Sequence, residues 1–198
     1  MVKVNRKEAE PMKEGYVDNR FASLYYKEMG QGMPLIMLHG NGESHEIFAR
    51  LSELMSRYYR VILMDSRGHG SSLMKEEAAG GDLTIPDMAA DVVQVMEFLH
   101  VPRAVILGFS DGANVALETA SCYPGRVSAV VAVSGNALPR GMSAASLMEV
   151  KIKYALWRGL DKVPLPRGVR ERAVKSRQLL GLMARWPRLD KEKLSCIQ

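Results

Sequence analysis

The chain has 198 residues, of which 47% are hydrophobic and 25% charged, and this is enough for one globular domain with a sizeable core. Its longest apolar runs have the length of strands, and the charged residues 1–14 lack the apolar core of a secretory signal. These features argue against a membrane protein and predict a cytoplasmic one. The two cysteines, Cys122 and Cys196, agree with this prediction, since isolated cysteines are typical of reduced thiols.

The net charge of +5 is unevenly distributed along the chain. Residues 1–137 carry a net charge of −4, whereas residues 138–198 carry +9. A basic region of this kind could attract nucleic acid, an anionic membrane or an acidic substrate. No sequence motif for nucleic-acid binding accompanies it, so we favour a solvated outer face and expect neither nucleic acid nor membrane as a partner.

Apolar runs and helical patterns alternate along the first two thirds of the chain. Apolar strands without polar alternation, joined by helices, predict an α/β fold with a parallel sheet covered on both faces. In the first helix, the spacing of the apolar residues indicates one shared face for Phe48, Leu51, Leu54 and Met55. Strands are expected at 21–28, 35–38, 60–64, 104–107 and 127–133, and helices at 44–55, 84–99 and 112–123.

The pattern changes after Gly135. Residues 138–195 show only helical segments interrupted by prolines, with no strand. Helices inserted beyond a sheet of this kind are well placed to form a lid over its edge. We therefore expect a core over residues 1–137 and a helical lid or cap region over residues 138–198.

The pentapeptide Gly108-Phe109-Ser110-Asp111-Gly112 is the strongest motif in the chain. It follows the apolar run at 104–107 and precedes a helical pattern, so it reads as strand, sharp turn and helix. Glycines on both sides of such a turn allow a strained backbone and close contact between strand and helix. Ser110 is therefore the candidate nucleophile.

Two further motifs stand at the ends of earlier strands and complete a family resemblance. The runs 39–42 (His-Gly-Asn-Gly) and 65–71 (Asp-Ser-Arg-Gly-His-Gly-Ser), together with the pentapeptide at Ser110, resemble the α/β-hydrolase superfamily in order and position. The runs 110–113, 123–124 and 135–137 are similar to small bacterial hydrolases and valacyclovir-hydrolase-like esterases. The resemblance implies an α/β-hydrolase fold with a mostly parallel sheet and a helical lid. It also implies a serine hydrolase that cleaves a small ester, amide or thioester through an acyl-enzyme on Ser110.

The same resemblance implies which groups stabilise the developing oxyanion. These are the backbone N–H groups of Asn41 and Asp111, assisted by the positive end of the helix that begins near Gly112. The Asp111 side chain is free for other work. It is either a favourable charge in the first turn of a helix or a recognition group for a cation on the substrate.

The four histidines, His39, His45, His69 and His100, all precede Ser110. We expect His39 and His69 to brace their loops by hydrogen bonds, and His45 and His100 to lie on the surface. The histidines and cysteines show no metal-ligand spacing and the glycines no nucleotide-binding motif, so neither a metal nor a cofactor is expected.

In the family, the triad acid and base follow two strands beyond the lid, and this sequence ends at Gln198 before them. The simplest hypothesis is a truncated form of a longer hydrolase whose last strands are missing. The alternative is a non-catalytic binding module that keeps the fold without the triad base. A sheet that ends at the strand 127–133 exposes an unpaired edge, which favours a homodimer through that edge or low solubility.

Overall fold

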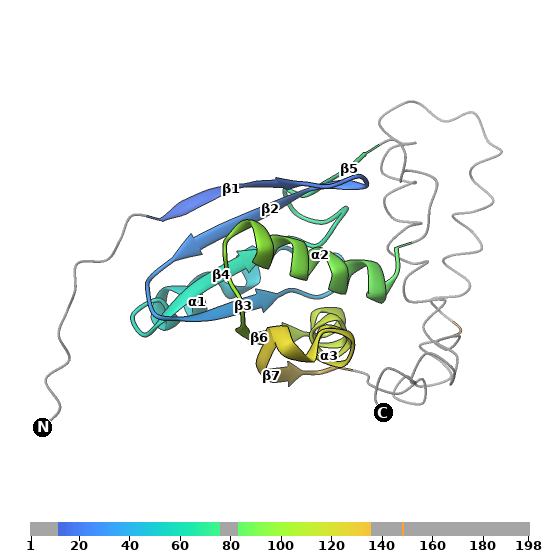
Figure 1. Ribbon diagram of the computed structural model, residues 1–198. Coiled ribbons are helices and arrows are strands. Elements are labelled where there is room, and N and C mark those ends of the chain that lie inside the picture. The colour runs from blue at the N-terminus through green and yellow to red at the C-terminus, as the bar shows by residue number, and fades with distance from the viewer. Residues whose placement is uncertain (1–11, 76–82, 136–147, 149–198) are drawn as a thin grey trace, which may run out of the picture.

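The computed structural model describes residues 12–75, 83–135 and Met148 (Figure 1). The helical lid expected over residues 138–198 lies outside the described residues, apart from Met148. Within the described parts, no helix has the length and apolar character needed to span a bilayer.

The described strands form one sheet of seven strands in which a parallel portion adjoins an antiparallel one. Four strands run parallel in the order β4-β3-β6-β7, and β2 pairs antiparallel with β4, β1 and β5. The mostly parallel sheet predicted from the sequence is confirmed. The strands are β1 Lys13–Asp18, β2 Ala22–Met29, β3 Met33–Leu38, β4 Tyr59–Met64, β5 Leu73–Met74, β6 Ala104–Phe109 and β7 Val127–Val133.

Two of these strands were not expected from the sequence. β1 alternates exposed and partly buried residues, and only Val17 in it is fully buried. β5 has two residues. Because β1 has no run of apolar residues and β5 is too short to form a recognisable pattern, each depends on hydrogen bonding to β2 for its conformation, and that pairing cannot be seen in the local sequence.

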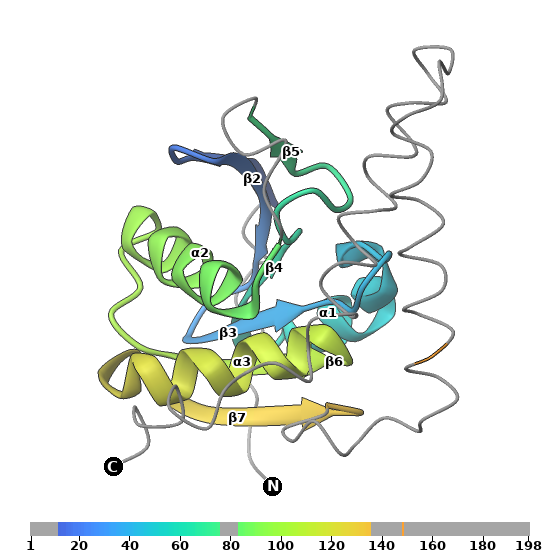
Figure 2. The same cartoon turned by 90° about the vertical axis from the view of Figure 1, so that its right-hand side faces the viewer.

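Helices cover both faces of the sheet, as the sequence predicted. α2 and α3 lie on one face and α1 lies on the other, which is clearest when Figures 1 and 2 are compared. Hydroxyl groups cap two of the helix starts, since Ser44 accepts from the N–H of Glu46, and Thr84 accepts from the N–H of Asp87. The helices are η1 His45–Phe48, α1 Ala49–Met55, α2 Ile85–Phe98, α3 Asp111–Cys122 and η3 Pro124–Arg126.

The core has two layers because neighbouring residues of a strand point to opposite faces. In β3, Ile36 and Leu38 pack in the cluster that contains the apolar residues of α2 and α3. Leu35 and Met37 pack in a second cluster with Phe48, on the side of α1. The buried parallel strands are therefore apolar on both faces, which explains why their sequence lacks polar alternation.

The face predicted for the first helix is wrong for half of its residues. Phe48 is buried, but Leu51 and Leu54 are 37% and 51% exposed, and Ser52 is buried in their place. Phe48, Ser52 and Met55 have the spacing of one helical face, and Phe48 and Met55 on this face pack in the second cluster. The buried face therefore passes through the small polar Ser52, which a pattern of apolar residues alone does not indicate.

The strand order reverses at β3, and this reversal determines where a site can form. The chain passes from β3 to β4 on one side and later returns to β6 on the other side of β3. In open α/β sheets, ligands bind outside the carboxyl ends of the strands at such a point. His39, Asp65 and Ser110 directly follow the ends of β3, β4 and β6, so the three sequence motifs meet at this edge.

β7 is the last strand of the described sheet and pairs only with β6 there. Val131 and Val133 on this strand are 46% and 42% exposed. Both features agree with the exposed edge expected from the sequence, and the homodimer through that edge stays a prediction.

A buried ion pair joins the loop after β4 to α2. Arg67 donates through Nε and a terminal nitrogen to the two carboxylate oxygens of Asp91, at 2.6 and 2.7 Å, and also donates to the carbonyl of Asp87. The amide of Asn19, in the turn between β1 and β2, donates to the same carboxylate. The pair therefore connects three segments that are distant in the sequence.

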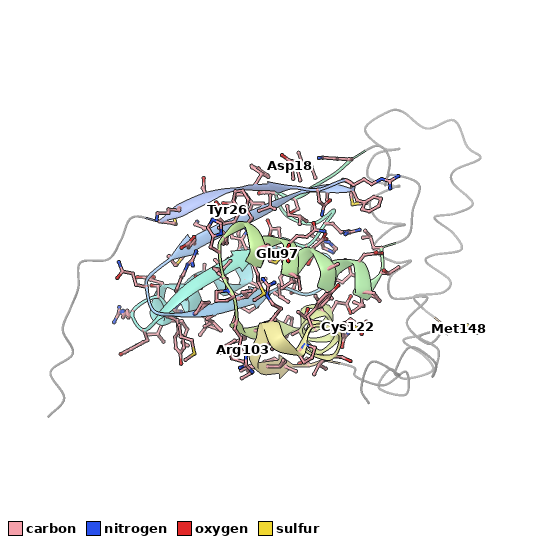
Figure 3. The ribbon with its side chains drawn as sticks, viewed as in Figure 1. Asp18, Tyr26, Glu97, Arg103, Cys122 and Met148 are labelled. Atoms are coloured by element: carbon pink, nitrogen blue, oxygen red, sulfur yellow. The ribbon has the colours of Figure 1, made fainter. Side chains whose placement is uncertain are left out.

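We predict that Arg67→Ala lowers the free energy of unfolding by about 3–5 kcal/mol, because it leaves the buried carboxylate of Asp91 without its counter-ion. Arg126→Ala is the matched control, since Arg126 pairs with Glu97, an exposed residue of α2 that Figure 3 labels. The variant also loses a hydrogen bond to the carbonyl of Val101, and the two losses together cost about 1–2 kcal/mol. Urea unfolding of both variants measures the difference, and equal losses would contradict the prediction.

Candidate functional site

Ser110 lies at the tip of a strained turn between β6 and α3. Its backbone has φ 53° and ψ −118°, a region that residues with a side chain rarely adopt. The N–H of Ser110 donates to the carbonyl of Val133 at the end of β7, at 2.8 Å. The tight turn and this hydrogen bond hold the serine beyond the carboxyl ends of β6 and β7, where the sequence placed it.

The two glycines beside Ser110 permit contacts that no other residue would allow. A Cβ on Gly108 would lie 2.2 Å from the carbonyl oxygen of Gly112, and a Cβ on Gly112 would lie 2.1 Å from the carbonyl oxygen of Leu38. Both distances are far below van der Waals contact. The start of α3 therefore packs directly on the backbone at the end of β3.

The loop after β3 lies against Ser110. The position of a Cβ on Gly40 would be 3.1 Å from Cβ of Ser110. Gly40, Asn41, Asp111 and Gly112 line one small cavity of about 10 Å³, which is about the space of one water molecule. The fold thus brings Asn41 and Asp111 together beside Ser110, as the oxyanion hypothesis requires of their amides.

The Asp111 carboxyl points into the molecule. One oxygen accepts a hydrogen bond from the side-chain amide of Asn114 at 3.3 Å, and Oδ2 is buried with no hydrogen-bond partner among the described residues. Burial raises the pKa of this carboxyl, and the hydrogen bond from Asn114 only partly opposes the shift. Asp111 also lines the small cavity that Asn41 borders.

His39 and His69 brace their loops, as the sequence predicted. The ring of His39 donates from Nδ1 to the carbonyl of Gly40 at 2.7 Å, and its Nε2 accepts from the N–H of Ser66 at 3.1 Å. Burial lowers the pKa of His39, which agrees with the neutral ring that these two bonds require. His69 bonds the carbonyl of Arg67 at 3.0 Å and the Asn41 side chain at 3.3 Å.

Asp65 connects the segment after β3 with the loop after β4. Its fully buried carboxylate accepts hydrogen bonds from the backbone N–H of His45 at 2.6 Å and of Ser71 at 2.8 Å. The ring of His45 donates to it as well, 3.1 Å from each oxygen. The surface position predicted for His45 is therefore wrong, since its side chain is only 13% exposed. The error arises because the partner carboxylate is 20 residues away in the chain.

Glu43 also belongs to this site, although the sequence motifs did not indicate it. Its carboxylate Oε2 accepts from the N–H of Gly40 at 2.9 Å, and its own N–H donates to the carbonyl of Gly40 at 3.3 Å. The carboxylate lies 2.7 Å from the position of a Cβ on Gly40, on the side where Ser110 also approaches. The only signal in the sequence is an acidic residue directly after the run 39–42, which is also typical of an exposed turn.

The described residues contain no group of three or more His, Cys, Asp or Glu side chains arranged to hold a metal ion. His100 is exposed and follows α2, at the amino end of β6 and away from Ser110.

Comparison with known proteins matches this arrangement to one family. The family described as the alpha/beta hydrolase fold matches residues 33–169, more than half of the chain. A proline iminopeptidase of Neisseria meningitidis is 30% identical over 128 residues, which are 62% of this chain and 40% of the relative. A pimeloyl-[acyl-carrier protein] methyl ester esterase of Chromobacterium violaceum is 31% identical over 113 residues, 57% of this chain and 41% of the relative.

The chain spans less than half the length of these curated relatives. Among solved structures, an N-acyl homoserine lactonase variant complexed with N-hexanoyl homoserine superposes with a TM-score of 0.67 at 20% sequence identity. That match covers 90% of this chain and 70% of the lactonase. This structural match supports the fold of the chain and nothing beyond the fold.

We predict that Gly112→Ala destabilises the protein by about 3 kcal/mol or more, because its methyl group would collide with the backbone of β3. Gly125→Ala is the matched control, since a Cβ there meets no atom within 4 Å. Thermal unfolding of the two variants checks the prediction, and similar midpoints would show that α3 can move away from β3 without cost.

Asp111→Asn should stabilise the protein in a pH-dependent manner. A carboxyl whose pKa is raised by folding stabilises the native state fully at pH values below its pKa in the unfolded chain, which is about 4. This stabilisation is lost as the pH rises through the pKa of the carboxyl in the folded protein. The amide does not ionise, so the variant should match the wild type near pH 4 and exceed it by about 1 kcal/mol at pH 8. Urea unfolding across this range measures the difference. A constant difference would contradict the pKa shift.

Proposed function

Because the chain belongs to the α/β-hydrolase family, we propose that it cleaves a small ester, amide or thioester through an acyl-enzyme on Ser110. The observation that carries the proposal is the strained turn at Ser110, pressed against Gly40 at the end of β3. A strained serine conformation persists only where the surrounding structure enforces it, and such strain is concentrated at functional sites. The named activities of the peptidase and the esterase support acyl chemistry.

In the proposed reaction, the Ser110 hydroxyl attacks the carbonyl carbon of the substrate and forms a tetrahedral intermediate. Its negative oxygen would accept hydrogen bonds from the amides of Asn41 and Asp111, and the start of α3 adds the positive end of a helix dipole. Collapse of the intermediate releases the alcohol, amine or thiol, and water then hydrolyses the acyl-serine.

A second candidate function is binding without turnover by the same fold. The observation that favours it is that the ring nitrogens of His39 and His69 all form hydrogen bonds. Loss of the base of a serine triad leaves only about 10³–10⁴-fold catalysis over water, from the oxyanion amides and substrate binding. Chemical labelling of Ser110 distinguishes the hydrolase function from the binding function.

A fluorophosphonate probe should label Ser110, as located by mass spectrometry of the digested protein, and Ser110→Ala should abolish the labelling. Ser128→Ala, on the exposed side of β7, should label like the wild type. If the folded wild-type protein stays unlabelled at Ser110 at millimolar probe, the hydrolase proposal is wrong and the binding function is favoured.

A further inference from the structure

The peptide unit between Gly40 and Asn41 carries one of the two N–H groups proposed to stabilise the oxyanion. No peptide bond among the described residues is cis, so this unit is trans. In a trans peptide the carbonyl and the N–H lie in one plane and point in opposite directions. The groups that hold the carbonyl of Gly40 therefore also set the direction of the N–H of Asn41.

Two donors hold that carbonyl. Nδ1 of His39 donates to it at 2.7 Å, and the backbone N–H of Glu43 donates to it at 3.3 Å. The second bond closes a tight turn in which Gly42 has φ 77°, a left-handed value that glycine adopts readily. Because the bond that closes the turn is long, the shorter bond from His39 is the main restraint on the carbonyl.

The ring of His39 can form this bond in only one tautomer. Its Nε2 accepts a hydrogen bond from the N–H of Ser66 at 3.1 Å, so the proton of the neutral ring must lie on Nδ1. The side chain is fully buried, and solvent therefore does not compete for either bond. Burial also lowers the pKa of His39, which favours the neutral ring that both bonds require.

The other proposed oxyanion amide, that of Asp111, is oriented without such help. Asp111 is the first residue of α3, and the N–H groups in the first turn of a helix point out of its amino end. Asn41 lies in a turn, outside any helix or strand. The two amides therefore differ in what orients them, and only the amide of Asn41 depends on a side chain.

We infer that His39 is a positioning residue that directs the N–H of Asn41 toward the oxyanion, an inference that rests on the proposed function. The donors form a chain with one direction. The N–H of Ser66 donates to Nε2, Nδ1–H donates to the carbonyl of Gly40, and the N–H of Asn41 would donate to the substrate oxygen. Each bond in such a chain polarises the next group, so the last donor becomes stronger. No proton is transferred along it.

The test uses two substitutions that each keep one half of this chain. The side-chain nitrogen of asparagine is attached to Cγ, as Nδ1 of histidine is, so His39→Asn can still donate to the carbonyl of Gly40. The amide of glutamine lies one atom further out, at the place of Nε2. His39→Gln therefore keeps an acceptor for the N–H of Ser66 and loses the donor to Gly40.

The measurement is the rate at which a fluorophosphonate labels Ser110 in the full chain. Because loss of one oxyanion donor costs about 10²–10³-fold in rate, His39→Gln should react at least about 10-fold more slowly than the wild type, and His39→Asn within about three-fold of it. His100→Asn is the matched control, since His100 is exposed at the other end of β6 and should react at the wild-type rate.

The kinetics also separate orientation of the amide from general damage to the loop. The oxyanion develops only in the transition state, so the loss in His39→Gln should appear in the rate at saturating probe. The probe concentration that gives half of this rate should stay unchanged. A loop that has merely lost its shape would bind the probe more weakly, and that result would overturn the inference.

The remaining outcomes distinguish the two proposals. Labelling of His39→Gln as fast as that of His39→Asn would overturn the inference, while the hydrolase function stands. Absence of labelling at Ser110 in the wild type would overturn both. Nitrogen-15 NMR of the histidine rings tests the inference without any substitution. It should find the proton of His39 on Nδ1, and a proton on Nε2 would leave the carbonyl of Gly40 without its donor and overturn the inference.

Discussion

The direct packing of the start of α3 on the end of β3 is the constraint on which the rest of the site depends. Gly112 lies against the carbonyl oxygens of Leu38 and His39, at distances that exclude a side chain. This contact places the positive end of α3 beside the loop that follows β3. Because α3 starts so close to β3, the chain must reverse between β6 and the helix within the strained turn at Ser110.

The polar residues around this contact act mainly as structural supports. Asp65 receives hydrogen bonds from two loops, His39 joins the loops after β3 and β4, and His69 contacts Asn41. Because these groups are buried and hydrogen-bonded, they hold positions rather than exchange protons during a reaction. These groups therefore hold in place the loops that carry the amides of Asn41 and Asp111, which are proposed to stabilise the oxyanion.

Two acidic residues, Glu43 and Asp111, lie close to Ser110, although the whole chain carries a net charge of +5. Glu43 follows the loop after β3, and Asp111 begins α3. Their environments differ, since Glu43 is partly exposed whereas Asp111 has a buried oxygen and a raised pKa. Burial therefore makes the Asp111 carboxyl one that is more easily kept neutral.

The sequence by itself determined the buried strands, the order of the motifs and the turn at Ser110, because these depend on apolar runs and on glycines only a few residues apart. The tertiary structure alone decided the pairing of β1 with β2, the exposure of Leu51 and the burial of His45. It also decided that Glu43 turns back over Gly40 toward Ser110. The physical reason is the same in each case. A pairing across strands or a contact between loops depends on partners that are distant in the chain, and local periodicity carries no information about them.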